Sequence, residues 1–203
     1  MMALINLGSS NIQSVINALD FLQIKYTITT TPQEIQKCDK IILPGVGTFG
    51  NGIEHLHKLN LFNIIKTEVL FNHKPILGIC LGMQMLFNSS QESPGIEGLG
   101  LIEGEVVSLP FSENYKIPRI GWAESAVKFD FLGLNKNENI DFYFIHSFYV
   151  LPNNDEIVSI STNTRLTAAI QHKNIYGCQF HPEKSHKHGL KILESFNLLE
   201  RTI

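Results

Sequence analysis

Short apolar runs alternate with helix-type patterns along the first half of the chain. Apolar residues at 12, 15, 16 and 19 would share one face of a helix over Asn11–Phe21. Further helices are predicted at Gly50–Leu59, at Leu61–Phe71 and directly after residue 80. Between them, apolar and β-branched runs predict strands at Ala3–Leu7, Ile24–Thr29, Lys40–Leu43 and Pro75–Ile79. Strands separated by helices are typical of βαβ units and a parallel sheet.

The second half of the chain has a different pattern, with many strand-type segments and few helical ones between them. β-Branched and aromatic residues predict strands at Leu101–Leu109, Asp141–Leu151, Glu156–Ser161, Thr167–His172 and Ile175–Phe180. A last helix is expected over Lys187–Leu199, and the polar stretches Asn88–Gly100 and Ser112–Arg119 are expected to be surface connections. We therefore expect one α/β domain over residues 1–203, with a more antiparallel second half.

Composition narrows the class of protein. The chain has 203 residues and 43% hydrophobic residues, which is enough for one sizeable core. Its formal net charge is −3 with no long basic run, which argues against nucleic acid as a partner. The longest candidate membrane segment is too short to span a bilayer. Three cysteines (Cys38, Cys80 and Cys178) suggest a reducing compartment, and we expect a cytoplasmic protein.

Cys80 is the strongest candidate for chemistry. It lies in Gly78-Ile79-Cys80-Leu81-Gly82, directly after an apolar run and before a helical pattern. This order predicts a strand, a tight turn and a helix, which is the layout of a nucleophile elbow. The flanking glycines would let a strained backbone present a reactive thiol.

A second candidate is the segment Gly177–Ser185, which starts as an apolar strand and ends in a turn. In an extended segment His181 and Glu183 would point to the same side. A carboxylate beside an imidazole fixes its tautomer and makes it a better base, which a thiol nucleophile requires. Taken alone, a surface His–Glu pair without chemistry is an equal alternative. With Cys80 in the same chain, the catalytic interpretation is favoured.

A third candidate is the loop that begins with Pro44-Gly45-Val46-Gly47 after a predicted strand. Its backbone N–H groups would lie at the carboxyl edge of the sheet, where α/β proteins bind ligands. They could stabilise an oxyanion on a carbonyl attacked by Cys80. A plain strand-to-helix loop is the alternative, and a phosphate loop is less favoured because no Lys-Ser/Thr pair follows.

Together these three motifs resemble the signatures of class I, triad-type glutamine amidotransferases. Their order and spacing match, and they span nearly the whole chain. The chain further resembles the HisH family, the glutaminase subunits of imidazole glycerol phosphate synthase. The likeness lies in its length as a stand-alone chain and in the segments Gly98–Gly104, Gly121-Trp122 and Tyr143–Ser147. The resemblance implies a three-layer fold, with a mostly parallel central sheet, helices on both faces and a more antiparallel C-terminal half.

The resemblance also implies roles for individual residues. Cys80 would attack the side-chain amide of glutamine, His181 would act as base and then acid, and Glu183 would orient His181. Backbone N–H groups of Leu81 and of Val46 or Gly47 would form the oxyanion hole. The glutamine would be held by Gln84, Glu92, Ser147 and Phe148, and the synthase partner would face Trp122, Tyr143 and Lys184.

The family's partner is HisF, a (β/α)8-barrel synthase that would receive the ammonia in a heterodimer. No cofactor is implied. A metal site at His181, His186 and His188 is disfavoured, because no cysteine or carboxylate cluster completes a ligand set. We expect His146, within an aromatic strand, to pack or to line a pocket.

Several positions depart from the usual HisH pattern, among them Arg119, Ile120, Ala123 and Phe148. The first three lie near Trp122, on the expected partner face. An alternative role is therefore that of a HisH-like paralogue that supplies ammonia to amidinate a bacterial surface sugar. Less favoured alternatives are a cysteine hydrolase of γ-glutamyl or peptide substrates and a non-catalytic regulatory module.

Overall fold

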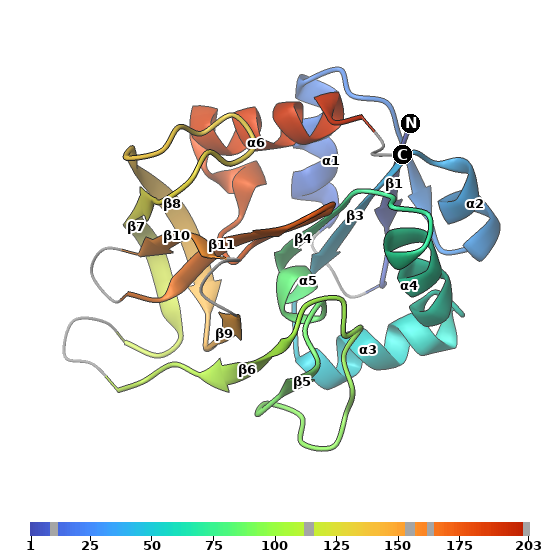
Figure 1. Ribbon diagram of the computed structural model, residues 1–203, viewed down its shortest axis with the longest axis horizontal. Helices are drawn as coiled ribbons and strands as arrows, with labels where there is room; N and C mark the ends of the chain where they lie inside the picture. The colour runs from blue at the N-terminus through green and yellow to red at the C-terminus, as the bar shows by residue number, and fades with distance from the viewer. Residues whose placement is uncertain (9–11, 112–115, 153–156, 162–164, 201–203) are drawn as a thin grey trace.

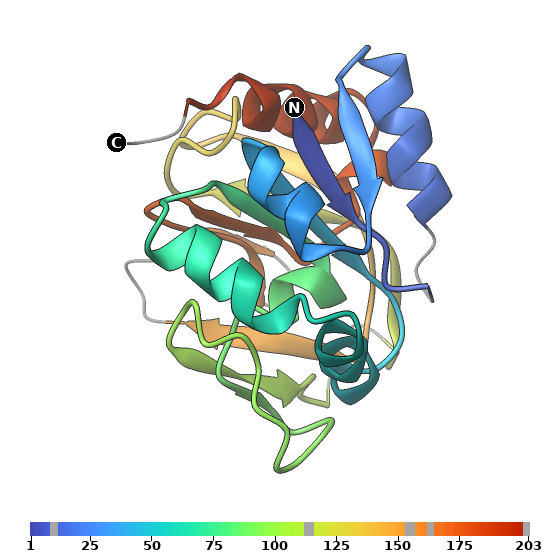
Figure 2. The ribbon, with the colours of Figure 1, turned by 90° about the vertical axis from the view of Figure 1, so that its right-hand side faces the viewer.

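A mixed nine-stranded sheet with helices on both faces forms the body of the protein in a computed structural model (Figures 1 and 2). The structure describes residues 1–8, 12–111, 116–152, 157–161 and 165–200. The strands of the large sheet lie in the order β2-β1-β3-β4-β12-β11-β10-β7-β8. A second, three-stranded sheet has the order β5-β6-β9.

The first half of the chain builds the parallel part of the sheet. Its strands are β1 (Met2–Ile5), β2 (Tyr26–Thr29), β3 (Lys40–Gly45) and β4 (Ile76–Cys80). Its helices are α1 (Ile12–Phe21), α2 (Pro32–Lys37), α3 (Phe49–Lys58), α4 (Phe62–Leu70) and the short α5 (Leu81–Gln84). Parallel pairing follows because each strand returns through a helix that covers the sheet.

The second half is mostly antiparallel, as expected. Its strands are β5 (Ser89–Ser90), β6 (Gly104–Ser108), β7 (Arg119–Val127), β8 (Asn139–His146), β9 (Phe148–Pro152), β10 (Ile157–Ser161), β11 (Thr167–His172) and β12 (Ile175–Cys178). A 3-10 turn over Pro182–Lys184 and helix α6 (His186–Leu198) follow. Two parallel pairs are exceptions, because β5 pairs parallel with β6 and β12 pairs parallel with β4, although β12 also pairs antiparallel with β11.

Two apolar clusters fill the space between the sheet and its helices. On one face, α1 and α6 bury Val15, Leu19, Ile192 and Phe196 against the sheet. On the other face, α2, α3 and α4 bury a second set that includes Ile35, Ile53, Leu56, Ile65 and Val69. Figure 1 shows α1 and α6 above the sheet and α3 on its opposite side. Each of these helices turns one apolar face to the sheet, which explains the helical spacing of apolar residues in the sequence.

Three expectations about the elements are corrected. The predicted strand Asp141–Leu151 is two strands, β8 and β9, which belong to different sheets. A strand was not expected at Arg119–Val127, where β7 pairs along its length with β8, because that segment alternates weakly and is half polar. Helix α2 was also missed, because its six residues carry one buried apolar side chain, Ile35. Glu156, at the start of another predicted strand, lies outside the described residues.

The three sequence motifs meet at one edge of the sheet. Strand β4 lies between β3 and β12, and all three run parallel. Gly45, at the end of β3, pairs with Cys80, while Cys178 at the end of β12 pairs with Ile79. The segments that follow these strands therefore emerge side by side at the carboxyl edge, where open α/β sheets bind ligands.

Candidate active site

Cys80 occupies a strained backbone position between β4 and α5. Its φ of 55° and ψ of −111° lie outside the regions that residues other than glycine readily adopt. Such strain costs of order 1–3 kcal/mol and persists only where the surrounding structure enforces it. The thiol group thereby reaches a cavity while only 7% of the residue is exposed. The sequence predicted this turn correctly.

The flanking glycines act by leaving space, and the cysteine itself adopts the positive φ. A Cβ on Gly82 would lie 1.7 Å from the carbonyl oxygen of Leu43 in β3. A Cβ on Gly78 would lie 2.7 Å from the backbone nitrogen of Met83. Both contacts are with backbone, which cannot move aside without shifting a strand or a helix. The two glycines let α5 turn back closely over β3 and β4.

His181 and Glu183 form a buried pair beside the cavity. Nδ1 of His181 donates to Oε1 of Glu183 at 2.8 Å, and their side chains are 4% and 3% exposed. The expected extended backbone is corrected, because residues 182–184 form a 3-10 turn. The hydroxyl of Ser185 donates to the His181 carbonyl at 2.7 Å and helps to hold this turn. The two side chains therefore meet across a turn that begins at His181.

The second ring nitrogen of His181 is the atom available for chemistry. Nε2 is buried and makes no hydrogen bond to any residue that the structure describes. Burial lowers the pKa of His181, but interactions with the Cys80 sulfur and with Glu183 outweigh it and raise the pKa to about 10. The ring therefore binds a proton firmly when the sulfur beside it carries negative charge.

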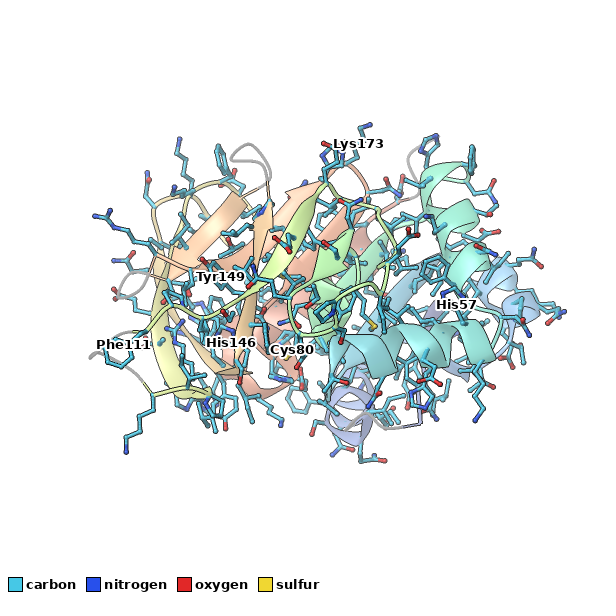
Figure 3. The ribbon with its side chains drawn as sticks, turned by 90° about the horizontal axis from the view of Figure 1, so that it is seen from below. His57, Cys80, Phe111, His146, Tyr149 and Lys173 are labelled. Carbon is cyan, nitrogen blue, oxygen red and sulfur yellow. The ribbon has the colours of Figure 1, made fainter. Side chains whose placement is uncertain are left out.

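A cavity of about 230 Å³ holds most of the residues that the sequence singled out. Its lining includes the following predicted residues: Val46, Gly47, Cys80, Leu81, Gln84, Glu92, Ser147, Phe148 and His181. Pro118, Ile145 and His146 complete it, and of these the sequence pointed only to His146, as a packed or pocket-lining residue. Figure 3 shows Cys80 and His146 near each other in the middle of the molecule.

The loop after β3 is held by side chains from a distant segment. Gly47 has a φ of 100°, which favours glycine and turns the backbone between Val46 and Thr48. At the start of α3, the N–H of Phe49 donates to Oε2 of Glu92 at 2.7 Å, and the N–H of Gly50 donates to the Ser93 hydroxyl at 2.9 Å. Glu92 and Ser93 thus cap α3 and fix one end of this glycine loop.

Gln84 is oriented by two hydrogen bonds. Its Nε2 donates to the Phe148 carbonyl and to Oε1 of Gln179, both at 3.0 Å. Nε2 of Gln179 in turn donates to the sulfur of Cys80 at 3.7 Å. Sequence reasoning missed Gln179, which is completely buried. Its place directly after Cys178 at the end of β12 was the available signal.

His146 is a neutral pocket-lining histidine. Nδ1 donates to the Phe148 carbonyl at 2.8 Å, since a carbonyl can only accept. Burial lowers its pKa to about 4, against the opposing effect of that hydrogen bond and with help from the charges of Arg119 and His181. Its Nε2 is buried without a partner among the described residues. The structure thus places His146 where the sequence expected it.

Trp122, Tyr143 and Lys184 gather outside the cavity on the β7–β8 face. The ring centroids of Trp122 and Tyr143 lie 6.0 Å apart, and Nζ of Lys184 lies 6.0 Å from the Tyr143 ring. His186 stacks on Trp122 with ring centroids 4.7 Å apart. Tyr143 is two residues from Ile145, whose carbonyl accepts a hydrogen bond from the Cys80 thiol at 3.6 Å. The backbone N–H of His181 also donates to the Tyr143 carbonyl at 2.9 Å, so this aromatic group lies beside the segment that carries His181.

The described residues contain neither a metal-binding cluster nor a membrane-spanning helix. Among them, no three histidine, cysteine or acidic side chains are grouped as a metal ion would need. None of the helices in the described part of the chain is long and apolar enough to cross a bilayer.

Comparisons with known proteins place these observations in a family. The family model described as glutamine amidotransferase class-I matches residues 3–198. The chain is 42% identical over 201 residues to "Imidazole glycerol phosphate synthase subunit HisH 2" of Methanococcus maripaludis, covering 97% of this chain and 98% of that protein. It is 44% identical over 203 residues to the HisH subunit of Pyrococcus furiosus, again covering 97% and 98%.

Solved structures share the fold. A crystal structure of a glutamine amidotransferase matches with a TM-score of 0.78 at 16% identity, over 97% of this chain and 99% of that one. A glutamine amidotransferase from Thermotoga maritima matches with a TM-score of 0.59 at 18% identity, over 90% of this chain and 75% of that one. At this level of identity the likeness concerns the fold alone.

Proposed function

Because the chain belongs to the class I glutamine amidotransferases and, among them, to the HisH glutaminase subunits, we propose that Cys80, His181 and Glu183 hydrolyse its glutamine. HisH subunits serve imidazole glycerol phosphate synthase in histidine biosynthesis. The observation that carries the assignment of residues is the buried Nε2 of His181, which has no hydrogen-bond partner among the described residues and lies in the same cavity as a strained cysteine. Family membership decides against the non-catalytic module and the general cysteine hydrolase.

The reaction begins with the Cys80 sulfur. It gives its proton to Nε2 of His181 and attacks the side-chain amide carbon of glutamine. His181 then passes the proton to the departing nitrogen, which leaves as ammonia, and a γ-glutamyl thioester remains on Cys80. Water, deprotonated by His181, hydrolyses the thioester to glutamate. Glu183 holds the ring through Nδ1 and stabilises its positive charge in both steps.

The tetrahedral intermediates carry negative charge on the former amide oxygen. The N–H of Leu81, at the first position of α5, has no carbonyl within its own helix to bind. It lies directly beside the nucleophile and is one donor to that oxygen. A second N–H comes from the loop at Val46 and Gly47, which the capped start of α3 holds in place.

The rest of the substrate is held by groups around the same cavity. Gln84 and the Ser147–Phe148 backbone line it, and Gln84 is fixed against the Phe148 carbonyl. Glu92 also lines it, and its carboxylate offers negative charge to the α-ammonium group of glutamine. One oxygen of Glu92 is already bound to the N–H of Phe49, so the carboxylate is held in position.

Ammonia released in water would be protonated and lost, so it must pass to a synthase partner. The HisH names of the relatives imply such a partner, and we propose a HisF-like (β/α)8 barrel in a heterodimer. The proposed contact face contains Trp122, Tyr143 and Lys184. Ile120 and Ile145 pair across β7 and β8 and are 58% and 40% exposed, so the same face is apolar.

Exposed Ile120 also keeps the second candidate role in view, because it departs from the HisH pattern on the surface that would meet a partner. Arg119, by contrast, is buried, and its guanidinium donates to the Ser161 hydroxyl at 2.7 Å. If the surface sugar pathway were the true role, the partner would be a HisF-like protein of that pathway. Complementation of a histidine auxotroph that lacks this glutaminase separates the two roles.

The direct test measures ammonia release from glutamine and from a γ-glutamyl peptide, with and without the synthase partner from the same organism. We expect glutamine to be the better substrate and the partner with its acceptor ligand to stimulate hydrolysis. Faster cleavage of the γ-glutamyl peptide, or full activity without any partner, would contradict the proposal.

A further inference from the structure

A chain of buried amides connects the cavity to the nucleophilic sulfur. It starts at the Phe148 carbonyl in β9, passes through Gln84 in α5 and Gln179 after β12, and ends at Cys80. Gln84 is 5% exposed and Gln179 is completely buried, so water does not replace these contacts. Every polar atom of this relay must find its partner within the protein.

The direction of the hydrogen bonds is fixed by chemistry. The Phe148 carbonyl can only accept, so the amide nitrogen of Gln84 faces it. The same nitrogen is 3.0 Å from Gln179, so its second hydrogen requires an oxygen there. That orientation of Gln179 leaves its own nitrogen on the opposite side, 3.7 Å from the sulfur of Cys80. The relay therefore presents an N–H donor, and never a carbonyl, to the nucleophile.

The polar neighbours of the sulfur favour different charge states. The Ile145 carbonyl, 3.6 Å away, accepts a hydrogen bond from the neutral thiol and repels a thiolate. An N–H directed at the sulfur does the opposite, because a hydrogen bond to an ionised acceptor is about twice as strong as one between neutral groups. His181 supplies the third interaction and takes the proton.

We propose that Gln179 is a catalytic residue whose amide N–H stabilises the Cys80 thiolate, and that Gln84 positions it for this role. This inference rests on the proposed function, since it takes Cys80 as the nucleophile. The thiol proton still goes to His181, and Gln179 exchanges none. Gln84 then has two tasks, because it faces the substrate cavity and also sets the orientation of the donor behind the sulfur.

The test is alkylation of the full-length chain by iodoacetamide across a range of pH, with the Cys80 peptide quantified by mass spectrometry. Cys38 and Cys178 are 2% and 0% exposed, so Cys80 is the accessible thiol. Gln179→Met keeps the length of the side chain and removes the N–H. Gln179→Glu keeps the shape and replaces the donor by an acceptor. Gln171→Met, on neighbouring β11 and outside the cavity lining, is the matched control.

We expect Gln179→Met to slow alkylation at neutral pH by roughly tenfold and to move the half-maximal rate to higher pH. Gln179→Glu should move it further, and Gln171→Met should leave it unchanged. A purely structural role would lower the yield of folded protein without moving the pH profile. A folded Gln179→Met with the wild-type profile overturns the inference.

Gln84 provides an independent arm in case the Gln179 variants do not fold. Gln84→Met leaves Gln179 in place but removes the hydrogen bond that orients the Gln179 amide, so that amide can rotate. The pH profile of alkylation should therefore shift to higher pH by a smaller amount than in Gln179→Met. The double variant should be no slower than Gln179→Met, and an unshifted Gln84→Met overturns the inference. Failure of the proposed function looks different, since the wild-type chain with its synthase partner would then release no ammonia from glutamine, whatever its alkylation profile.

Discussion

The two ends of β4 differ in whether the buried polar groups around them have hydrogen-bond partners. At its amino end, Lys74 is completely buried, and its ammonium group binds Glu68 at 2.8 Å and the carbonyls of Ile35 and Gln36 at 2.6 and 3.2 Å. All three of its hydrogens therefore have partners. At the carboxyl end, next to a cysteine with a strained backbone, three buried atoms make no hydrogen bond to any described residue: Nε2 of His181, Oε2 of Glu183 and Nε2 of His146.

This difference separates structure from function along a single strand. A buried polar atom without a partner costs about 1–3 kcal/mol, and such costs accumulate only where another requirement maintains them. The satisfied end should therefore determine stability and contribute little to the reaction. The unsatisfied end should determine the reaction and contribute little to stability. The predictions below test this division.

The largest effect is expected for Glu183→Gln. The amide still accepts from Nδ1 of His181, but it cannot stabilise the ring's positive charge. Glutamine hydrolysis with the partner present should fall by roughly 10³–10⁴-fold, the size seen when a triad carboxylate becomes an amide. The free energy of unfolding should fall less than in Lys74→Met below, because the neutral amide leaves no buried carboxylate without its cation. A large loss of stability together with a small loss of kcat would reverse the proposed division.

Lys74→Met tests the other end of the strand. It leaves Glu68 buried without its cation, so the free energy of unfolding should fall by about 3–5 kcal/mol. Activity per folded molecule should be unchanged, as measured by combining urea unfolding with an ammonia assay at low temperature. The double variant Lys74→Met/Glu68→Leu is the control and should recover much of the loss, because it also removes the stranded carboxylate. Unchanged stability in Lys74→Met would contradict this assignment.

His146 should make the stability of the protein depend on pH. The pKa of His146 is lowered from 6.5 to about 4, so its contribution is present above pH 6.5 and is lost as the pH falls through about 4.

Urea unfolding of the wild type and of His146→Gln at intervals from pH 4 to 7 measures the acid part of this dependence. The wild type should lose stability over that range, and the variant should lose less. Parallel curves for the two proteins would show that His146 does not cause the acid-side loss.

The smallest effect is expected for Ser93→Ala, which removes the cap on Gly50 without removing a cavity-lining side chain. The glycine loop before α3 should become looser, so kcat should fall about threefold with KM unchanged, within the roughly 1 kcal/mol of a helix cap. Thr31→Ala, which removes a hydroxyl that donates to Glu34 at the start of α2, is the matched control. Equal kcat in both variants would show that the Ser93 cap contributes to the structure and not to the reaction.

The sequence predicted the parallel half of the fold and the turn that carries Cys80 because both have local signals. Apolar periodicity marks β1, α1, β3 and β4, and the glycines around Cys80 mark the elbow. The antiparallel half was less well predicted. Strands β8 and β9 form one continuous apolar run, and only the pairing of β8 with β7 and of β9 with β6 separates them.

The contacts of the site depend on distant parts of the chain. Gln84 and Gln179 are 95 residues apart, and Phe49 and Glu92 are 43 apart. No spacing rule links them, so Gln179 and the cap by Ser93 were not foreseen. His181 and Glu183 were paired correctly, although for an extended backbone that the 3-10 turn replaces. Pairs of residues close together in the sequence could thus be predicted from their spacing, while contacts between distant segments required the fold.

The most direct test of the central claim is to trap the intermediate. The chain, with its synthase partner and acceptor ligand, is mixed with glutamine, quenched in acid after a few milliseconds and digested for mass spectrometry. We predict one γ-glutamyl group, labile to hydroxylamine, on the peptide that contains Cys80, and none in Cys80→Ala, which should also release no ammonia. Ammonia release that persists in Cys80→Ala, or an adduct on another residue, would contradict the account.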